Sequence, residues 1–195
     1  MVLLAAVFIG LAAGFLRAFI GRRTYRIYDL KWSWLVLAAF IPQYFAFFNL
    51  KTRISISNNL ASILLVSSLI LLLAFSLFNI HKVSFWPILL GFFLNFLVIL
   101  LNGGFMPISP ITLQKLLPGR ADTWTIGQRL GYGKDIVLTP EMTKLGFLSD
   151  RFLLPPIGNL RVAFSLGDVF IAIGVIWLLW SLGGTPGSIK KEKTL

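Results

Sequence analysis

Cysteine is absent from this chain of 195 residues, and histidine occurs only once, as His81. Without cysteine the chain has no disulfides, thiol nucleophiles, haem attachment motifs or cysteine-ligated metal sites. A single histidine cannot supply the several imidazoles of a multi-histidine zinc site. The sequence therefore predicts no metal ion and no other cofactor.

Charged residues are also scarce. They make up 13% of the chain, whereas soluble domains carry roughly 25%. Hydrophobic residues reach 57%, and the mean hydropathy is +0.85. Too few polar residues remain to cover a surface that faces water on all sides. We therefore expect an integral membrane protein with a single membrane domain over residues 1–195.

Long apolar runs supply the helices that such a protein needs. A helix crosses a bilayer core of about 30 Å with about 20 mostly apolar residues. The first run lacks the positively charged start of a signal peptide, so we expect a retained helix. The predicted fold class is an all-α, polytopic membrane helix bundle with about five transmembrane helices. These helices are expected at residues 2–20, 34–50, 60–80, 85–101 and 167–182.

The connections between these runs differ in kind. Pro42 is expected either to kink the second run or to close its first half, and Lys51–Asn59 to form a short polar loop. The stretch 102–166 holds six of the nine prolines, and so long a loop without structure would be unusual. We expect it to fold into an irregular cap between helices 4 and 5. Within it, Ile111–Leu117 and Thr139–Phe147 favour short amphipathic helices on the membrane.

The net charge is +11. The lysines and arginines flank the apolar runs or lie in the basic tail, 183–195. This arrangement leaves no soluble basic face for nucleic acid and indicates membrane lipids as partners. Loops rich in Lys and Arg stay in the cytoplasm. The loop after the first run has Arg22, Arg23, Arg26 and Lys31, against Lys51 and Arg53 after the second. We therefore expect the N-terminus and the cap outside, and the C-terminus in the cytoplasm.

Asparagines near the cap are the first candidate site residues, because polar groups within a membrane are costly. Asn95 and Asn102 lie seven positions apart, two turns along one face of the helix expected at residues 85–101 and its end. Asn102 begins a turn in which glycines permit a sharp bend and proline stops the helix from resuming. Asn102 either satisfies backbone groups of this turn or contacts a substrate or ion. The candidate binding residues here are Asn95, Asn102, Gly103, Gly104, Met106 and Pro107.

Two aspartates are the candidate catalytic residues. Asp168 follows Ser165 at the start of helix 5, where a carboxylate satisfies free amides and the positive end of the helix dipole. Alternatively, Asp168 pairs with Asp150, and the two carboxylates share a proton as acid and base towards a water. Arg151 and Arg161 either neutralise these acids or bind lipid phosphate. Asp122, Asp135 and Glu141 are interpreted as solvated charges, and Gln128-Arg129 as a turn.

Several short sequence motifs resemble those of a bacterial multi-pass membrane family catalogued as domain of unknown function 5317. They are Asn102-Gly103-Gly104-Phe105-Met106-Pro107, Leu148-Ser149-Asp150 and Ser165-Leu166-Gly167-Asp168-Val169 with Ile173-Gly174. Their order around a long loop matches, and the resemblance covers most of the chain. It implies a fold and a location in the bacterial cytoplasmic membrane, but no chemistry.

A second, local likeness is to lipoprotein signal peptidase. In that family an aspartate before the last helix and another at its start form a catalytic dyad, which the resemblance places at Asp150 and Asp168. Ser165 and Gly167 stand where that family has Asn and Ala. An upstream Gly-Asn-X-X-Asp-Arg phrase is also missing from this chain.

Three functional classes follow. The first is an accessory or structural membrane subunit of unassigned biochemical role, whose outer cap contacts a lipid headgroup or another membrane protein. The second is a membrane hydrolase that uses Asp150 and Asp168. The third is a small-solute transporter, which the scarcity of charges within the apolar runs disfavours.

Overall fold

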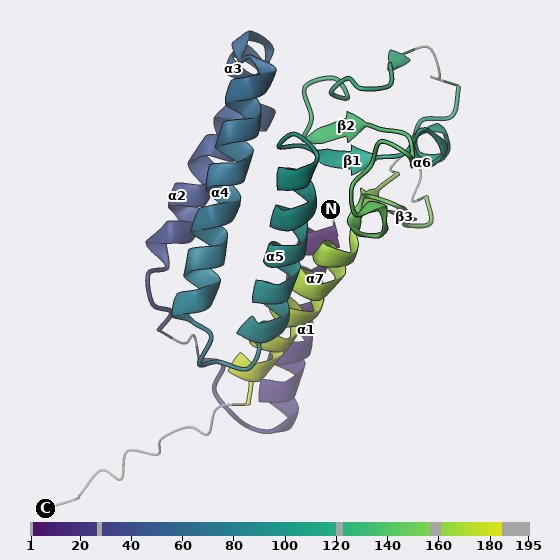
Figure 1. Ribbon diagram of the computed structural model, residues 1–195. Helices are drawn as coiled ribbons and strands as arrows, with labels where there is room; N and C mark the ends of the chain where they lie inside the picture. Colours follow the sequence, from purple (N-terminus) through teal and green to yellow (C-terminus); the bar gives the residue numbers. More distant parts are fainter. Residues whose placement is uncertain (1, 27–28, 120–122, 157–160, 185–195) are drawn as a thin grey trace, which may run out of the picture.

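The structure is a computed structural model that describes residues 2–26, 29–119, 123–156 and 161–184. Within them the chain is mostly helical, and its long helices pack side by side with the cap at one end (Figure 1). Contacts join neighbours in the order α2, α4, α5, α7, α1, so the first and last helices are adjacent. The long helices are α1 (Val2–Ile20), α2 (Trp34–Gln43), α4 (Asn58–Phe78), α5 (Phe85–Leu101) and α7 (Leu166–Leu182).

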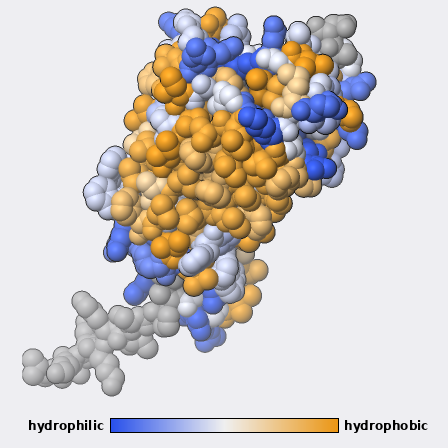
Figure 2. Space-filling model, viewed as in Figure 1, coloured by the Kyte–Doolittle hydropathy of each residue, from blue (hydrophilic) through white to orange (hydrophobic). Residues whose placement is uncertain are grey.

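Two of these helices are long and apolar enough to cross a membrane. They are α1, with 19 residues, and α4, with 21. The apolar helices Phe85–Leu101 and Leu166–Leu182 have 17 residues each, and Trp34–Phe48 is shorter still. On the face that Figure 2 shows, a broad hydrophobic band covers the middle of the bundle, between hydrophilic residues at its two ends.

Pro42 changes the helix that contains it. Proline has no backbone N–H to bond the carbonyl four residues back. Soon after it the helix widens into a π-helical turn, η1 (Tyr44–Phe48), closed by a bond from the Asn49 amide to the Tyr44 carbonyl. The predicted kink therefore takes the form of a wider turn.

The polar loop predicted at Lys51–Asn59 is wrong, because part of it is helical. Asn49 caps the short helix α3 (Leu50–Ser55) by accepting hydrogen bonds from the amides of Lys51 and Thr52. Ser57 then caps α4 in the same way. The two caps satisfy amides that would otherwise lack partners, which allows helix on both sides of a sharp bend.

Glycines let α5 and α7 approach closely. A Cβ at Gly91 would collide with the carbonyl of Gly167 and with Ile171, and a Cβ at Gly174 would collide with Ile88. Small residues at such crossings allow the backbones of apolar helices to pack tightly. The helix α7 thereby carries Asp168 directly against α5.

The cap contains two small sheets, although an irregular cap was expected. Strand β1 (Met106–Ile108) pairs in parallel with β2 (Asp135–Val137), and β3 (Phe152–Leu153) pairs antiparallel with β4 (Ala163–Phe164). The helix α6 (Pro110–Leu116) follows β1, close to the helix predicted there. Its neighbour β1 packs with both bundle and cap residues, because Met106 shares a buried cluster with Leu65 of α4 and Val98 of α5.

The helix predicted at Thr139–Phe147 is wrong. The segment forms turns and then a single 3-10 turn, η3 (Gly146–Leu148). Leu145 adopts a left-handed backbone conformation, with φ of 54°. That conformation cannot continue a right-handed helix, and it reverses the chain ahead of Asp150.

Candidate functional site in the cap

An ion pair with one buried partner lies in the cap. The Lys134 ammonium is 2.6 Å from Oδ2 of Asp150 and 3.2 Å from Oδ1 of Asp135. The side chain of Asp150 is only 4% exposed, whereas that of Lys134 is 42% exposed. The pair therefore places one charge deep in the cap and the other at its edge. The second oxygen of Asp150, Oδ1, is buried without a hydrogen-bond partner.

Burial raises the pKa of Asp150 to about 6, although Lys134 acts in the opposite direction. The negative charges of Asp135 and Asp168 contribute to the same increase. Burial also lowers the pKa of Lys134, but its carboxylate neighbours outweigh this and raise the pKa above the usual value. Lys134 is accordingly charged at neutral pH, while Asp150 gains a proton at mildly acidic pH.

Strand β1 explains how Lys134 and Asp150 meet. The Met106 amide donates to the Lys134 carbonyl at 2.9 Å, and the Asp150 amide donates to the Pro107 carbonyl at 3.1 Å. Two consecutive residues of β1 thus hold both partners of the ion pair by their backbones. Met106 and Pro107, predicted as binding residues, are themselves almost fully buried. Their place is in the frame of the site.

Asp168 lies in a second polar cluster, between α5 and α7. Asn95 Nδ2 donates to Asp168 Oδ1 at 3.0 Å, and Ser165 Oγ donates to Asn95 Oδ1 at 2.8 Å. The Asp168 amide donates to Ser165 Oγ, and the Ser165 amide donates to Asp168 Oδ2. This reciprocal pattern is a capping box at the start of α7. The two predicted residues, Asn95 and Asp168, are therefore in direct contact.

The two candidate catalytic aspartates are near enough for the charge of Asp168 to raise the pKa of Asp150. Each carboxylate nevertheless has its own partners, Lys134 for Asp150 and the Asn95–Ser165 pair for Asp168. If one carboxylate acts as acid and the other as base towards a single water, that water must reach both of them. The burial of Asp150 and the bonds of Asp168 favour structural roles for these acids.

Asn102 binds backbone groups, the first of its two predicted roles. Its Nδ2 donates to the carbonyls of Val98 and Lys144, and its Oδ1 accepts from the Lys144 amide at 2.9 Å. The side chain thus mimics a strand neighbour and ties the end of α5 to the segment before η3. Gly103 and Gly104 follow with φ of 76° and 82°, a conformation that glycine adopts without strain.

A pocket of about 350 Å³ opens beside the ion pair. Ser149 and Arg151 lie on its wall, while Asp150 between them turns inward to Lys134. This alternation is typical of an extended chain. The pocket carries four hydroxyl groups and one guanidinium, a set that suits a small anionic or hydroxylated group. Its lining residues are Ser109, Ile111, Thr112, Pro140, Thr143, Gly146, Ser149 and Arg151.

The remaining predicted residues lie apart from this pocket. The Arg161 guanidinium donates to the Lys115 carbonyl at 3.2 Å and does not neutralise Asp150. Asp135, interpreted as a solvated charge, is instead the first residue of β2 and pairs with its neighbour Lys134. Asp122 lies outside the described residues. The cap pocket thus contains Arg151 alone from the predicted set.

Lys134 and Arg129 are residues that sequence reasoning missed. Arg129 donates to the carbonyls of Gly133 and Tyr132 at 2.6 and 2.7 Å, and its guanidinium lies 5.2 Å from the ring of Phe47. It therefore ties the β1–β2 connection to the end of α2–η1. The sequence was interpreted as a turn at Gln128-Arg129, and the spacing of the residues in this segment does not predict the ion pair of Lys134.

Comparison with known proteins identifies the family. The model of a family of unknown function, DUF5317, matches residues 27–180. Because this match covers most of the chain, the protein belongs to that family. No curated protein and no solved structure matches, and the comparisons give no sign of a signal peptidase.

Proposed function

We propose that this member of the DUF5317 family is a multi-pass membrane protein with an accessory role, whose cap binds an anionic headgroup at the outer membrane surface. The observation that carries the proposal is the cap pocket, where Arg151 and four hydroxyl groups line one cavity. Guanidinium matches the geometry of phosphate and carboxylate oxygens. Thr143 and Ser149 donate their hydroxyl protons to backbone carbonyls, and the hydroxyls of Ser109 and Thr112 bond each other, so Arg151 is the main donor to such a group.

The membrane placement is supported by the hydrophobic band that separates two hydrophilic ends (Figure 2). In this proposal all five long helices cross, with α2 and η1 acting as one segment over Trp34–Phe48. The shorter segments cross by thinning the bilayer locally or by snorkelling of flanking residues. The cap then lies outside, and the arginine-rich turn after α1 lies in the cytoplasm.

The absence of cysteine gives this topology a clean test, because any introduced cysteine is the only one. Arg22→Cys and Lys82→Cys are expected to resist a membrane-impermeant maleimide in intact bacterial cells. Lys51→Cys and Lys144→Cys are expected to react. Labelling of positions 51 and 82 from the same side would contradict a crossing by α4.

Headgroup binding has its own test. A photo-crosslinking amino acid at Ile111, an exposed residue of the pocket wall, is expected to yield a lipid adduct that mass spectrometry identifies. Arg151→Gln is expected to remove most of that adduct. The same amino acid at Met142, exposed on the cap but outside the pocket lining, serves as the control. A protein adduct at Ile111 in place of lipid would show that the cap contacts a partner protein instead.

A membrane hydrolase is the second candidate, and one observation favours it. Asp150 has a raised pKa and an unpartnered buried oxygen, and the charge of Asp168 reaches it. Water would enter only if Lys134 moved away from Asp150. Exchange of solvent ¹⁸O into a bound peptide or lipid ester, lost in Asp150→Asn and Asp168→Asn, would support this candidate.

A further inference from the structure

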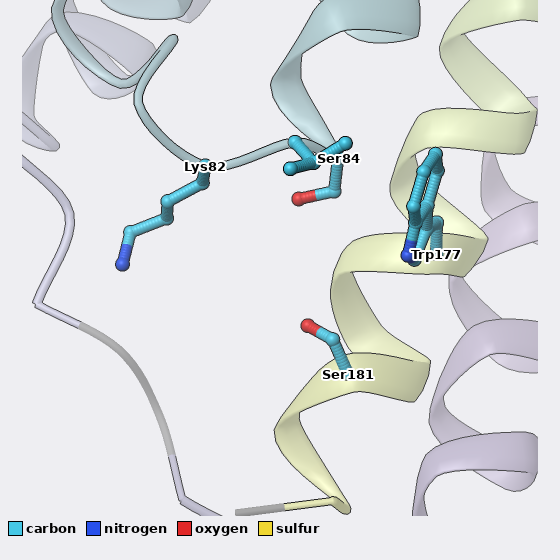
Figure 3. Close-up of a pocket in the computed structure, with 5 residues that line it drawn as sticks. Lys82, Ser84, Trp177 and Ser181 are labelled. Carbon is cyan, nitrogen blue, oxygen red and sulfur yellow. The ribbon is translucent and has the colours of Figure 1, made fainter.

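A second pocket, of about 330 Å³, lies beside the turn between α4 and α5, at the end of the bundle opposite the cap (Figure 1). Figure 3 shows this pocket in close-up. It opens between the turn that joins α4 to α5 and the last two turns of α7. Its lining residues are Lys82, Val83, Ser84, Trp177 and Ser181. None of them belongs to the cap site or was predicted as a binding residue.

The packing of α5 against α7 produces this pocket. Gly174 sits against the Ser84 carbonyl and Ile88, so the two helices are in contact there. α5 begins at Phe85, close to this contact, while α7 continues past it to Leu182. Trp177 and Ser181 lie three and seven positions after Gly174, on the same helical face. That face therefore loses its helical neighbour, and a cavity remains.

Ser84 is the polar group that points to a ligand. The residue is 5% exposed, yet its side chain makes no capping bond to α5. Among the described residues the Ser84 hydroxyl has no hydrogen-bond partner. Figure 3 shows its oxygen pointing into the space between Lys82 and Ser181. Because this oxygen faces the pocket, its proton is available to a ligand that accepts a hydrogen bond there.

Ser181 differs from Ser84, because its hydroxyl already donates to the Leu178 carbonyl at 2.7 Å. Ser181 lines the pocket, and its hydroxyl oxygen can still accept a hydrogen bond. Trp177 forms part of the wall, and tryptophan is the side chain that prefers the level of lipid headgroups. The recognition of an acceptor group therefore depends on Ser84.

Positive charge surrounds this end of the bundle. The Arg17 guanidinium lies 3.7 Å from the ring of Trp180, and the Arg23 guanidinium donates to the Gly184 carbonyl. Asn79 holds the Lys31 backbone by two bonds and also accepts from the Lys82 amide through its carbonyl. In the described parts of segments 17–33, 79–84 and 177–184, Asp29 is the one acid. The ligand that suits this field is an anion.

We propose that this pocket binds the phosphate group of an anionic ligand. The Ser84 hydroxyl donates to a phosphate oxygen, the Lys82 ammonium neutralises the charge, and Trp177 covers one side. The proposal rests on the membrane placement given above, which puts the pocket at the cytoplasmic headgroup level. The phosphate belongs either to a phospholipid or to a soluble phosphate, and the chemistry of the site is the same for both.

The test uses the purified full chain and two probes, a short-chain phosphatidylglycerol and inorganic phosphate. Native mass spectrometry counts bound lipid, and a thermal shift reports stabilisation by either probe. Ser84→Ala and Lys82→Gln are each expected to weaken binding roughly tenfold, which corresponds to the loss of one charge-assisted hydrogen bond. Ser84→Thr, which keeps the hydroxyl, is expected to retain binding.

Matched controls separate this site from general effects. Ser67→Ala removes a partly buried serine of α4 whose hydroxyl bonds its own helix, and Lys51→Gln removes a lysine at the cap end. Both are expected to bind like the unmodified chain. Saturable stabilisation by inorganic phosphate identifies a soluble ligand, and lipid binding that phosphate does not displace identifies a headgroup.

Two results would overturn the proposal. The first is unchanged binding in Ser84→Ala, including the case in which Lys82→Gln alone weakens it, because charge without the hydroxyl means a diffuse basic surface. The second is the absence of binding by both probes in the unmodified chain. The cysteine-labelling pattern reports separately whether the membrane placement holds, so the two failures are distinguishable.

Discussion

The ammonium of Lys134 and the carboxylate of Asp150 are 2.6 Å apart, and strand β1 binds the backbone of both residues. Sixteen positions separate them in the chain. The contact therefore links the β1–β2 connection to the segment that follows η3, and it fixes the inner wall of the cap pocket.

Removal of Lys134 is expected to weaken the cap more than removal of Asp150. Lys134→Met leaves a buried carboxylate without its main partner, which we expect to lower the free energy of unfolding by about 2 kcal/mol, since the lysine is partly solvent-screened. Asp150→Asn leaves Lys134 paired with Asp135 and removes a carboxylate whose ionisation opposes folding, so it is expected to change the free energy of unfolding by less than about 1 kcal/mol. Thermal unfolding of purified protein measures both, with Lys144→Met as the exposed control.

The stability contributed by Asp150 is expected to depend on pH in an unusual direction. Its pKa is about 6 in the folded protein and 3.8 as the ordinary value, so the folded state takes up the proton first. Ionised Asp150 therefore opposes folding at pH 7, and this penalty disappears as the pH falls from 7 to about 4. The difference between the unmodified chain and Asp150→Asn should change by at most about 3 kcal/mol.

Denaturant unfolding of both proteins across this pH range provides the measurement. The unmodified chain is expected to gain stability relative to Asp150→Asn on acidification. Parallel pH curves for the two proteins would mean that burial does not raise the pKa of Asp150.

Asn95 is expected to be structural for the α5–α7 contact. Asn95→Leu leaves Asp168 Oδ1 and the Ser165 hydroxyl without their partner, at a cost of about 1–3 kcal/mol. A double-mutant cycle with Asp168→Asn isolates the coupling between them. Additive losses in that cycle would contradict a direct contact between Asn95 and Asp168.

The glycine contacts between α5 and α7 are expected to tolerate no side chain. Gly91→Ala places a methyl group against the Gly167 backbone and Ile171, and overpacking of this kind costs about 1–3 kcal/mol. Gly146→Ala is the matched control, because a Cβ there meets Thr143 at an ordinary 3.7 Å. Melting temperatures of the two variants in the same detergent decide the comparison.

The positions of the long helices follow closely from the length of the apolar runs. The helices Val2–Ile20 and Phe85–Leu101 have the bounds that the apolar runs predict, because polar or glycine-rich turns end them. The helix α3 escaped prediction, since its stability comes from the Asn49 cap and not from an apolar run.

The candidate site was harder to predict than the helices. Asp168 beside Ser165 carried the signature of a capping box, and the structure contains one. Asn95 was predicted as a site residue because a polar side chain within an apolar helix is costly. Its contact with Asp168 was not predicted, because a contact across 73 positions depends on tertiary packing. The Lys134 ion pair depends on the parallel pairing of β1 with β2. Strands of three residues are too short for this pairing to be predicted from the sequence.

The adjacency of α1 and α7 has a consequence for how the protein is made. Gly10 and Gly14 of α1 fit against α7, and Gly183 sits directly on the Gly14 backbone. A ribosome completes α1 first and α7 last of the long helices, so in the proposed membrane placement α1 waits in the bilayer without its neighbour while the rest of the chain is synthesised. Its small-residue face stays open to other membrane proteins, or to the insertion machinery, throughout that interval.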